Sequence, residues 1–290
     1  MTIDYDTLAN WRFPETAQTY DWKDTALYAL GIGLGADPLN EDELKFVYEP
    51  WLQALPTMAA VLAGPGFWIR DPAVGIDWAN SLHGEQEIVL HRPLPATGAV
   101  KGRMRVDSLI DKGPGKGSLL TTCNDLYDAA TNEHIASVYA TAFNRNDGGF
   151  GGPAGSRPPV HPTPDRKPDH LVDLPTLPQS ALLYRLNGDD NPLHAEPAVA
   201  IGAGFRMPIL HGLCTFGIAG HALLKTVCGY DPDRFGSMRV RFSAPVYPGE
   251  TIRTEIWDEG RNRFAFRCSV PERNLAVITG GLLQLRALAD

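Results

Sequence analysis

The sequence repeats its own landmarks 152 positions apart, and this duplication limits the possible folds more than any other feature. Pro93 lies in the run EIVLHRPLPATG, and Pro245 lies in a similar run, RVRFSAPVYPGE. Pro56 and Pro208, which each open an apolar stretch, are separated by the same interval. A repeated sequence is typical of a repeated structural unit. With 290 residues the chain is long enough for two units, so we predict a duplicated domain.

Each half combines one apolar helical stretch with several strand-like runs. In the second half we expect a helix that has Pro208 in its first turn and ends near Cys228 and Gly229, followed by four strands. Because that helix is apolar around most of its circumference, other elements of the fold must bury it. The pattern predicts an α+β double hotdog, in which two antiparallel sheets each wrap a central helix; other α+β folds stay open. The expected strands are Met238–Ser243, Thr251–Asp258, Arg263–Val270 and Leu275–Ala287.

The two halves are joined by a segment rich in glycine and proline. Such a composition does not fit inside a helix or a sheet. We therefore expect an N-terminal hotdog half at residues 1–147, a linker at 148–170 and a C-terminal half at 171–290.

Charge and composition exclude several classes of protein. The net charge of −8 argues against nucleic acid as a partner, since phosphate binding needs an excess of positive charge. No run approaches the roughly 20 apolar residues of a membrane span, and the start is polar and acidic, unlike an export signal. The four cysteines form no CxxC pair, so neither a disulfide framework nor a zinc knot is indicated. A cytoplasmic protein is expected.

The densest polar cluster is the run YRLNGDDNPLH, which ends at His194. A tight Asp-Asn-Pro turn separates Asp189 from His194 and could direct both side chains toward one water molecule. A carboxylate and an imidazole that share a water form a general acid/base pair. The alternative is structural: Asp189, Asp190 and Asn191 would form a cap and a turn before a short helix that begins at Pro192.

Several motifs together resemble one family. The run GDDNPLH is followed by PILHG, and LHGEQ, IDKGPG, GGFGG and RFSAPVYPGE occur elsewhere, so the likeness covers most of the chain. It closely resembles the MaoC-like (R)-specific enoyl-CoA hydratases of the hydratase 2 family, which includes the hydratase 2 domain of peroxisomal multifunctional enzyme type 2. Asn187 stands where that family usually has a smaller residue. As a short polar turn residue, it is a minor departure.

The resemblance implies a lyase of fatty acid metabolism and β-oxidation. Such a hydro-lyase adds water to trans-2-enoyl-CoA or, in reverse, dehydrates (R)-3-hydroxyacyl-CoA. It assigns Asp189 and His194 to acid/base catalysis and the Gly212 N–H to the oxyanion hole, where the missing side chain lets the thioester come close. Asn191 would either supply a second donor or fix the loop. No cofactor is implied, because coenzyme A is part of the substrate.

Three histidines could be imagined as metal ligands. They are His194, His211 and His221, but His211 and His221 are ten residues apart on one expected helix and so face different sides. We expect no metal.

The same resemblance places four residues at the coenzyme A site, namely His83, Gly84, Lys112 and Phe242. A lysine at the end of a strand can pair with a phosphate, and an aromatic ring can pack against pantetheine. Taken without the family, the same residue types fit a core histidine, a surface lysine and an ordinary strand aromatic.

The N-terminal half lacks the catalytic pattern. Its matching run, GLGADPLN, has Asn40 where the histidine would be, and its apolar stretch PTMAA has no His-Gly. The resemblance implies a non-catalytic half that binds the acyl chain. The alternative is that the apolar residues are ordinary core; they are Met58, Val61, Leu62, Phe67 and Trp68.

Two other functions compete with hydration. A hotdog thioesterase would hydrolyse the thioester, and a non-enzymatic module would only bind acyl-CoA; the pairing of Asp189 with His194 favours the hydratase. The residues do not indicate a chain-length preference. Single hotdogs obtain sheet-to-sheet pairing by dimerising, and two hotdogs in one chain already supply that pairing. A homodimer of this chain is therefore possible but not required.

Overall fold

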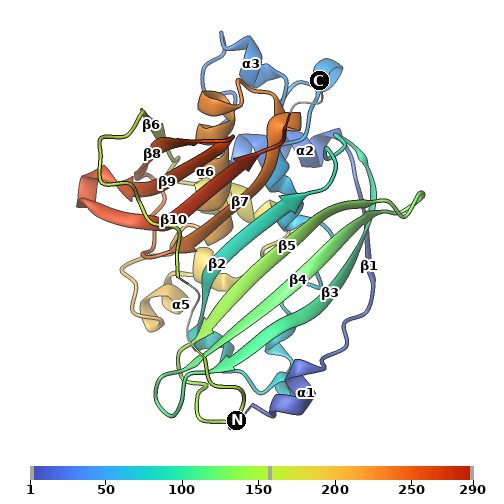
Figure 1. The fold of residues 1–290 in the computed structure, drawn as a ribbon, viewed down its shortest axis with the longest axis vertical. Coiled ribbons are helices and arrows are strands. Elements are labelled where there is room, and N and C mark those ends of the chain that lie inside the picture. Colours follow the sequence, from blue (N-terminus) through green and yellow to red (C-terminus); the bar gives the residue numbers. More distant parts are fainter. Residues whose placement is uncertain (1–2, 156–158, 288–290) are drawn as a thin grey trace.

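A computed structural model describes residues 3–155 and 159–287 of the chain. In these residues a single antiparallel sheet of ten strands runs through the molecule in the order β1-β3-β4-β5-β2-β7-β10-β9-β8-β6 (Figure 1). The first half supplies β1 (Thr16–Tyr20), β2 (Ser81–Leu90), β3 (Gly98–Asp111), β4 (Ser118–Asp128) and β5 (His134–Asn144). The second half supplies β6 (His170–Pro175), β7 (Phe235–Phe242), β8 (Thr251–Gly260), β9 (Arg263–Val270) and β10 (Leu275–Leu285).

The two halves of the sheet have the same topology. Read from its outer edge, the first half runs β1-β3-β4-β5-β2 and the second runs β6-β8-β9-β10-β7, which is the same permutation. The halves meet where β2 pairs with β7, and there Glu87 lies opposite Arg239, its own counterpart 152 positions later. A pseudo-twofold axis therefore passes through this seam. The predicted double hotdog is confirmed, with its two sheets joined edge to edge.

One long helix and several short ones accompany the sheet. None of the helices in the described parts of the chain has both the length and the apolar character that a membrane crossing requires. The α-helices are α1 (Tyr5–Ala9), α2 (Trp22–Gly31), α3 (Glu41–Leu44), α4 (Ser180–Tyr184), α5 (Pro197–Gly202) and α6 (Gly212–Val227). The 3₁₀ helices are Glu49–Trp51, Pro56–Val61, Trp68–Arg70, Pro72–Val74, Trp78–Asn80, Arg185–Asn187, Pro192–His194, Pro232–Arg234 and Pro271–Arg273.

The central helix of the second half, α6, begins later than the sequence predicts. Pro208 is not in its first turn, because residues 208–211 stay extended and the Leu210 N–H donates to the Val246 carbonyl at 2.8 Å. The predicted end is confirmed: Cys228 caps the helix and Gly229 follows with a φ of 64°. Every residue from Cys214 to Leu224 is buried, as an enclosed helix requires.

The first half has no matching long helix, so the expectation of two central helices is wrong. The stretch that begins at Pro56 forms only a six-residue 3₁₀ helix, Pro56–Val61. Ala63 then takes a positive φ of 45°, and the Gly-Pro-Gly that follows cannot continue a helix. Among the second-half strands, β9 has the predicted bounds, whereas β7 begins three residues early and β10 ends at Leu285.

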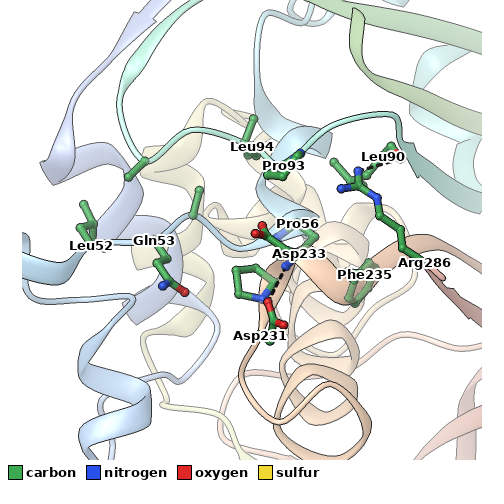
Figure 2. Close-up of a pocket in the computed structure, with 13 residues that line it drawn as sticks. Leu52, Gln53, Pro56, Leu90, Pro93, Leu94, Asp231, Asp233, Phe235 and Arg286 are labelled. Atoms are coloured by element: carbon green, nitrogen blue, oxygen red, sulfur yellow. Dashed lines mark hydrogen bonds between the residues drawn. The ribbon is translucent and has the colours of Figure 1, made fainter. Parts of the chain in front are cut away.

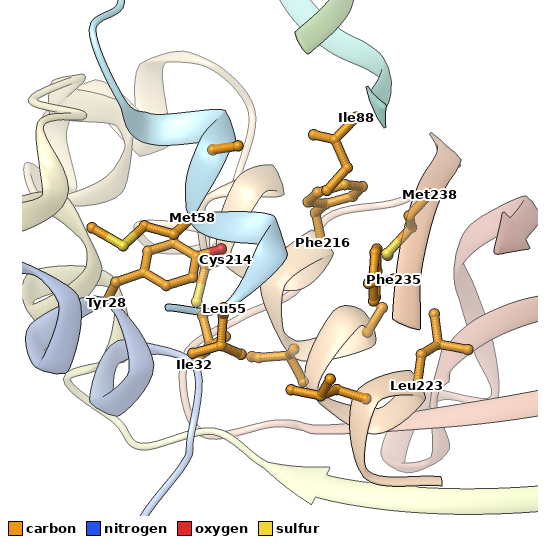
Figure 3. Close-up of a cluster of buried hydrophobic side chains, with 14 of the residues drawn as sticks. Tyr28, Ile32, Leu55, Met58, Ile88, Cys214, Phe216, Leu223, Phe235 and Met238 are labelled. Carbon is orange, nitrogen blue, oxygen red and sulfur yellow. The ribbon is translucent and has the colours of Figure 1, made fainter. Parts of the chain in front are cut away.

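A shared apolar core joins the halves (Figure 3). It holds Tyr28 and Ile32 from α2 and Met58 from the 3₁₀ helix, packed around α6. Two glycines of α6 make this packing possible: a Cβ on Gly217 would lie 2.7 Å from Ile32 Cγ2, and one on Gly220 would lie 2.5 Å from Thr57 Cγ2. The close approach of α6 to the end of α2 and to the 3₁₀ helix of the first half therefore depends on these glycines.

The degenerate motif of the first half has become part of a buried polar network. Asn40 caps α3 and donates from its side-chain amide to the Tyr230 hydroxyl at 3.2 Å. Tyr230 in turn donates to Glu43 at 3.0 Å, and the Gly35 N–H donates to the same carboxylate at 2.9 Å. The buried His221 ring of α6 lies 3.5 Å from Glu43. This network ties α3 of the first half to α6 of the second.

Glu43 is expected to stabilise the fold in a pH-dependent way. Burial opposes its ionisation, but His221, Tyr230 and the Gly35 N–H together lower the pKa of Glu43 to about 2. A carboxylate with a lowered pKa stabilises the fold above its unfolded pKa and loses that contribution as the pH falls toward the folded value. In urea unfolding, Glu43→Gln should cost about 1–3 kcal/mol at pH 7, and the difference from wild type should shrink between pH 5 and 3. A difference that is constant with pH would contradict this.

Candidate active site

The loop between α4 and α5 carries the predicted acid/base residues. Gly188 turns the chain with a φ of 104°, a conformation that glycine adopts without strain. Asp189 Oδ1 accepts the Asn191 N–H at 3.2 Å, and Asn191 Oδ1 accepts the Leu193 N–H at 3.1 Å. The cap and turn considered as an alternative are therefore present. The same turn brings a carboxylate oxygen of Asp189 within 4.8 Å of a ring nitrogen of His194.

The His194 ring is buried and held in one tautomer. Its Nδ1 lies 2.9 Å from the carbonyl oxygen of Ile209, and because a carbonyl only accepts, Nδ1 must carry the proton. Burial lowers the pKa of His194, while the Ile209 bond and the Asp189 charge partly offset the shift. The ring is therefore neutral at pH 7, and Nε2 carries a lone pair that can accept a proton.

Gly212 is the first residue of α6, where helical N–H groups have no partner within the helix. The capping position is held by His211, whose side chain makes no capping hydrogen bond. A Cβ built on Gly212 would lie 3.5 Å from the ring of Phe242, which is ordinary contact. The Gly212 N–H thus lies beside the Phe242 ring at the positive end of the helix dipole, where negative charge is stabilised.

His83 and Phe242 lie together across the seam between the halves. Their ring centroids are 5.0 Å apart in an edge-to-face contact. The register of β2 against β5 shifts at Gly84, so this glycine sits in a bulge next to His83, and bulges re-aim neighbouring side chains. Loss of water around the ring lowers the pKa of His83 although one edge stays exposed, and the Asp189 charge partly offsets this. The structure therefore brings His83 and Phe242 to the same site as Asp189.

Lys112 lies farther away, just beyond the end of β3. The sheet order puts β3 three strands from β2, or about 14 Å across the sheet. Its ammonium lies 4.7 Å from the centroid of the Phe143 ring. The neighbouring Asp111 accepts three backbone N–H groups, from Gly113, Gly149 and Gly151, at 2.7–2.9 Å. This carboxylate folds the motifs IDKGPG and GGFGG around each other and fixes the base of Lys112.

The side-chain oxygen of Asn191 accepts the Leu193 N–H within the turn. Of the two roles left open by the sequence, the structure shows the loop-fixing one.

The sequence did not indicate a role for His211, yet this residue contacts both predicted catalytic residues. Its ring stacks on that of His194, with centroids 3.8 Å apart and an angle of 29° between the planes. Its Nε2 lies 3.4 Å from the Asp189 carbonyl oxygen. The only sequence signal was its place beside Gly212 in PILHG. The extended residues 208–211, which replace the expected first turn of the helix, bring His211 here.

Asp189, His194 and His211 also form the kind of cluster that could hold a metal ion, since one ligand atom of each lies within 4.8 Å of the others. A metal needs lone pairs that converge on one point. One nitrogen of each ring is already engaged, because His194 Nδ1 faces the Ile209 carbonyl oxygen and His211 Nε2 faces the Asp189 carbonyl oxygen. His221 lies elsewhere, against Glu43, as its ten-residue separation from His211 predicted.

The pseudo-twofold axis places a counterpart of this site in the first half. His83 and Phe242 correspond, 152 positions away, to Phe235 and Leu90, and both of these line a pocket of about 240 Å³ (Figure 2). Asp233 and Arg286 are among the residues that line it (Figure 2). The pocket has apolar walls but no histidine. Leu90 of the first half and Phe235 of the second thus line this pocket together, and no acid/base pair like Asp189 and His194 is among the described residues that line it.

Two family models match the chain. The MFE-2 hydratase 2 N-terminal domain matches residues 18–146, and the MaoC like domain matches residues 159–279. An "Enoyl-CoA hydratase 2, peroxisomal" of Arabidopsis thaliana is 39% identical over 304 residues, which cover 98% of this chain and 96% of that protein. The chain belongs to the MaoC-like hydratase 2 family.

Two further proteins are similar to this chain over most of their length. The "3-hydroxyacyl-thioester dehydratase Y" of Mycobacterium tuberculosis is 41% identical over 258 residues, 87% of each chain. The crystal structure of a MaoC-like dehydratase from Phytophthora capsici is 37% identical and superposes with a TM-score of 0.86, over 99% of this chain and all of that one. The likeness to this MaoC-like dehydratase therefore extends over both halves of the fold.

Proposed function

We propose that this hydratase 2 family member is an (R)-specific 2-enoyl-CoA hydratase, a hydro-lyase that adds water across the double bond of trans-2-enoyl-CoA thioesters and dehydrates (R)-3-hydroxyacyl-CoA in reverse. The observation that carries the proposal is the pairing of Asp189 with a neutral His194 beside the N-terminus of α6. The relatives named as an enoyl-CoA hydratase and a 3-hydroxyacyl-thioester dehydratase support both directions of this reaction.

The acid/base pair has the chemistry that hydration needs. An ionised Asp189 and the Nε2 of neutral His194 are both acceptors, so one water can donate a hydrogen bond to each. As the water oxygen bonds to C3, the pair takes one of its protons, and a proton passes from the pair to C2. The elements of one water are added and the two side chains return to their starting states.

Charge that develops on the thioester oxygen needs a donor. When a base drives addition at C3, electrons move through the double bond onto that oxygen before C2 is protonated. The Gly212 N–H, at the uncapped start of α6, supplies a donor and the positive end of a helix dipole. We propose this N–H as the oxyanion hole.

The coenzyme A portion would extend from this point along the seam. We propose that His83, Gly84 and Phe242 line the path of the pantetheine arm, since they lie beside Asp189 and Gly212. Lys112, three strands away, would meet the phosphates, which the pantetheine arm separates from the thioester. Hydration moves no electrons out of the substrate and water, so the proposal includes no further cofactor.

The cellular setting and the assembly stay predictions. The four cysteines are unpaired and buried, as expected in a reducing cytoplasm, while the Arabidopsis relative is named as peroxisomal. A homodimer would be tested by light scattering of the purified chain.

The direct test is an assay with crotonyl-CoA and a C10 enoyl-CoA, with chiral analysis of the product. We expect (R)-3-hydroxyacyl-CoA and no release of free thiol. Release of coenzyme A would support a thioesterase instead, and binding without turnover would support a non-enzymatic module.

We also propose that residues 1–147 form a non-catalytic half that binds the acyl chain, with the linker at 148–170 and the catalytic half at 171–290. Met58 and Leu62 of the first half are each 2% exposed and pack in the shared core, whereas Trp68 packs in a separate cluster with Trp11. A long acyl chain must therefore displace core side chains such as the flexible Met58.

Substitutions in the first half should separate its stability from turnover. Asn40→Ala removes the cap of α3 and should cost about 1 kcal/mol of unfolding free energy, with turnover of crotonyl-CoA unchanged. Ala60→Trp, which enlarges a side chain packed against the core, should reduce turnover of the C10 substrate more than that of crotonyl-CoA. Steady-state kinetics on both substrates would check this. Equal losses would mean that Ala60 is only a core position that does not tolerate overpacking.

A further inference from the structure

We propose that His211 is a positioning residue that fixes the His194 ring and the Asp189 backbone relative to each other. This inference rests on the proposed hydratase function and extends it. His211 contacts the two residues in different ways, by a stacked ring face and by one N–H group. It therefore acts on the reaction through the acid/base pair.

Stacking restricts the His194 ring from one side. A single hydrogen bond from Nδ1 to the Ile209 carbonyl sets the tautomer but leaves the ring free to rotate about that bond. The His211 face, 3.8 Å away, removes this freedom, and the Tyr184 ring lies against His211 with centroids 5.2 Å apart. The His211 ring thus stacks on His194 and is itself in tilted contact with Tyr184 of α4.

The second contact acts on the backbone of the catalytic loop. Because a carbonyl only accepts, the Nε2 of His211 must donate to the Asp189 oxygen, and Nδ1 is then an unprotonated acceptor. That Nδ1 is fully buried and has no hydrogen-bond partner within the described residues. A side chain selected only to fill space would not bury such an acceptor, since an apolar ring avoids this cost. The N–H toward Asp189 gives a reason for the histidine.

The charges around His211 keep it neutral while His194 reacts. Burial and the nearby His194 and Arg185 together lower the pKa of His211 to about 4, although Asp189 acts in the opposite direction. Tyr184, on its other face, is buried and has a pKa raised well above its usual value, so it is uncharged as well. His211 is therefore neutral at pH 7 and supports the His194 ring as an uncharged side chain.

Three substitutions separate the two contacts. His211→Phe keeps the stacked ring and removes the N–H, His211→Gln keeps an N–H near the Nε2 position and removes the ring, and His211→Leu removes both. With crotonyl-CoA we expect kcat to fall about tenfold in the first two and about a hundredfold in the third, with KM within about twofold of wild type. The matched control is His221→Gln, since His221 is an equally buried histidine of α6 that faces Glu43.

The pH profile distinguishes positioning from packing. Without the stacked ring, water reaches His194 and relieves the burial that lowers its pKa. The acid limb of kcat/KM should then move up by at least about half a pH unit in His211→Gln and His211→Leu and stay in place in His211→Phe and His221→Gln. Thermal unfolding of each variant shows whether it is folded. If His211→Leu does not fold, His211→Phe and His211→Gln are enough to test the proposal.

Two results would overturn the proposal. One is a kcat within twofold of wild type in all three His211 variants. The other is a loss of kcat in proportion to the loss of stability, with no movement of the acid limb in His211→Gln. A wild-type protein without hydratase activity would refute the proposed function itself, which is a different outcome.

Discussion

Replacing Asp189 by Asn is expected to lower kcat for crotonyl-CoA by about 10²–10⁴ while leaving KM and the fold almost unchanged. The amide has the same shape, and its oxygen can still accept the Asn191 N–H that the Asp189 carboxylate accepts at 3.2 Å. It cannot take a proton, and it presents an NH₂ donor where the water needs an acceptor. The reactant water therefore loses one of its two acceptors. Rates of hydration at saturating substrate would measure the effect.

The neighbouring carboxylate provides the control for this prediction. Asp190 is exposed and only one residue away, so Asp190→Asn changes the net charge by the same amount without removing an acceptor from the paired site. It should retain wild-type kcat within about twofold. His194→Gln should resemble Asp189→Asn, because glutamine cannot act as a base. Full activity in Asp189→Asn or His194→Gln would refute the assignment of the pair.

Much of the fold could be predicted because its signals are local. An enclosed apolar helix needs only its own residues to be recognised, and the end of α6 at Cys228 and Gly229 follows from them. Strand β9 is bounded by turns on both sides and was predicted to the residue. The duplication added the long-range information, since two copies of one unit must pair in one way. The register of Glu87 opposite Arg239 shows that they do so about a pseudo-twofold axis.

The Gly-Pro-Gly after Ala63 is a local signal against a long helix in the first half, but the prediction followed the apolar composition of the stretch before it. Pro56–Val61 is apolar like the start of α6, but the Gly-Pro-Gly after Ala63 ends it, and α2 and α6 supply the packing that a long helix would otherwise provide. That compensation is tertiary and leaves no local periodicity. The same applies to Asn40 and Glu43, whose partners His221 and Tyr230 are 178 to 190 positions away.

Asp189 and His194 were predicted as the acid/base pair through a motif, whereas the contact of His211 with both of them was not predicted. Asp189 and His194 lie in one short loop, so their proximity follows from the turn. His211 reaches them from a different segment because residues 208–211 are extended, and the sequence predicted a helical turn there. An error of one turn in the start of a helix is enough to hide a contact between side chains at a site.

Because α6 begins at Gly212, the expected effect of a substitution at this residue can be stated more closely. A methyl group on Gly212 would meet the ring of Phe242 at 3.5 Å, an ordinary contact, so the folded protein has room for Gly212→Ala. Alanine is favoured over glycine in helices by up to about 1 kcal/mol, and the variant should be as stable as wild type or slightly more stable. Any loss of activity in Gly212→Ala must therefore come from a changed interaction with the substrate and not from unfolding.

We expect that loss to be large. The added methyl occupies the space through which the thioester approaches, so its oxygen is held away from the Gly212 N–H when charge develops on it. Loss of one such donor costs roughly 3 kcal/mol of transition-state stabilisation, or about a hundredfold in kcat. Thermal unfolding would measure the stability of Gly212→Ala, and kcat for crotonyl-CoA would measure its activity. Gly202→Ala, at the exposed end of α5 with no atom near its Cβ position, is the control and should keep wild-type kcat. A stable Gly212→Ala variant with wild-type kcat would show that Gly212 only lets Phe242 pack against the helix.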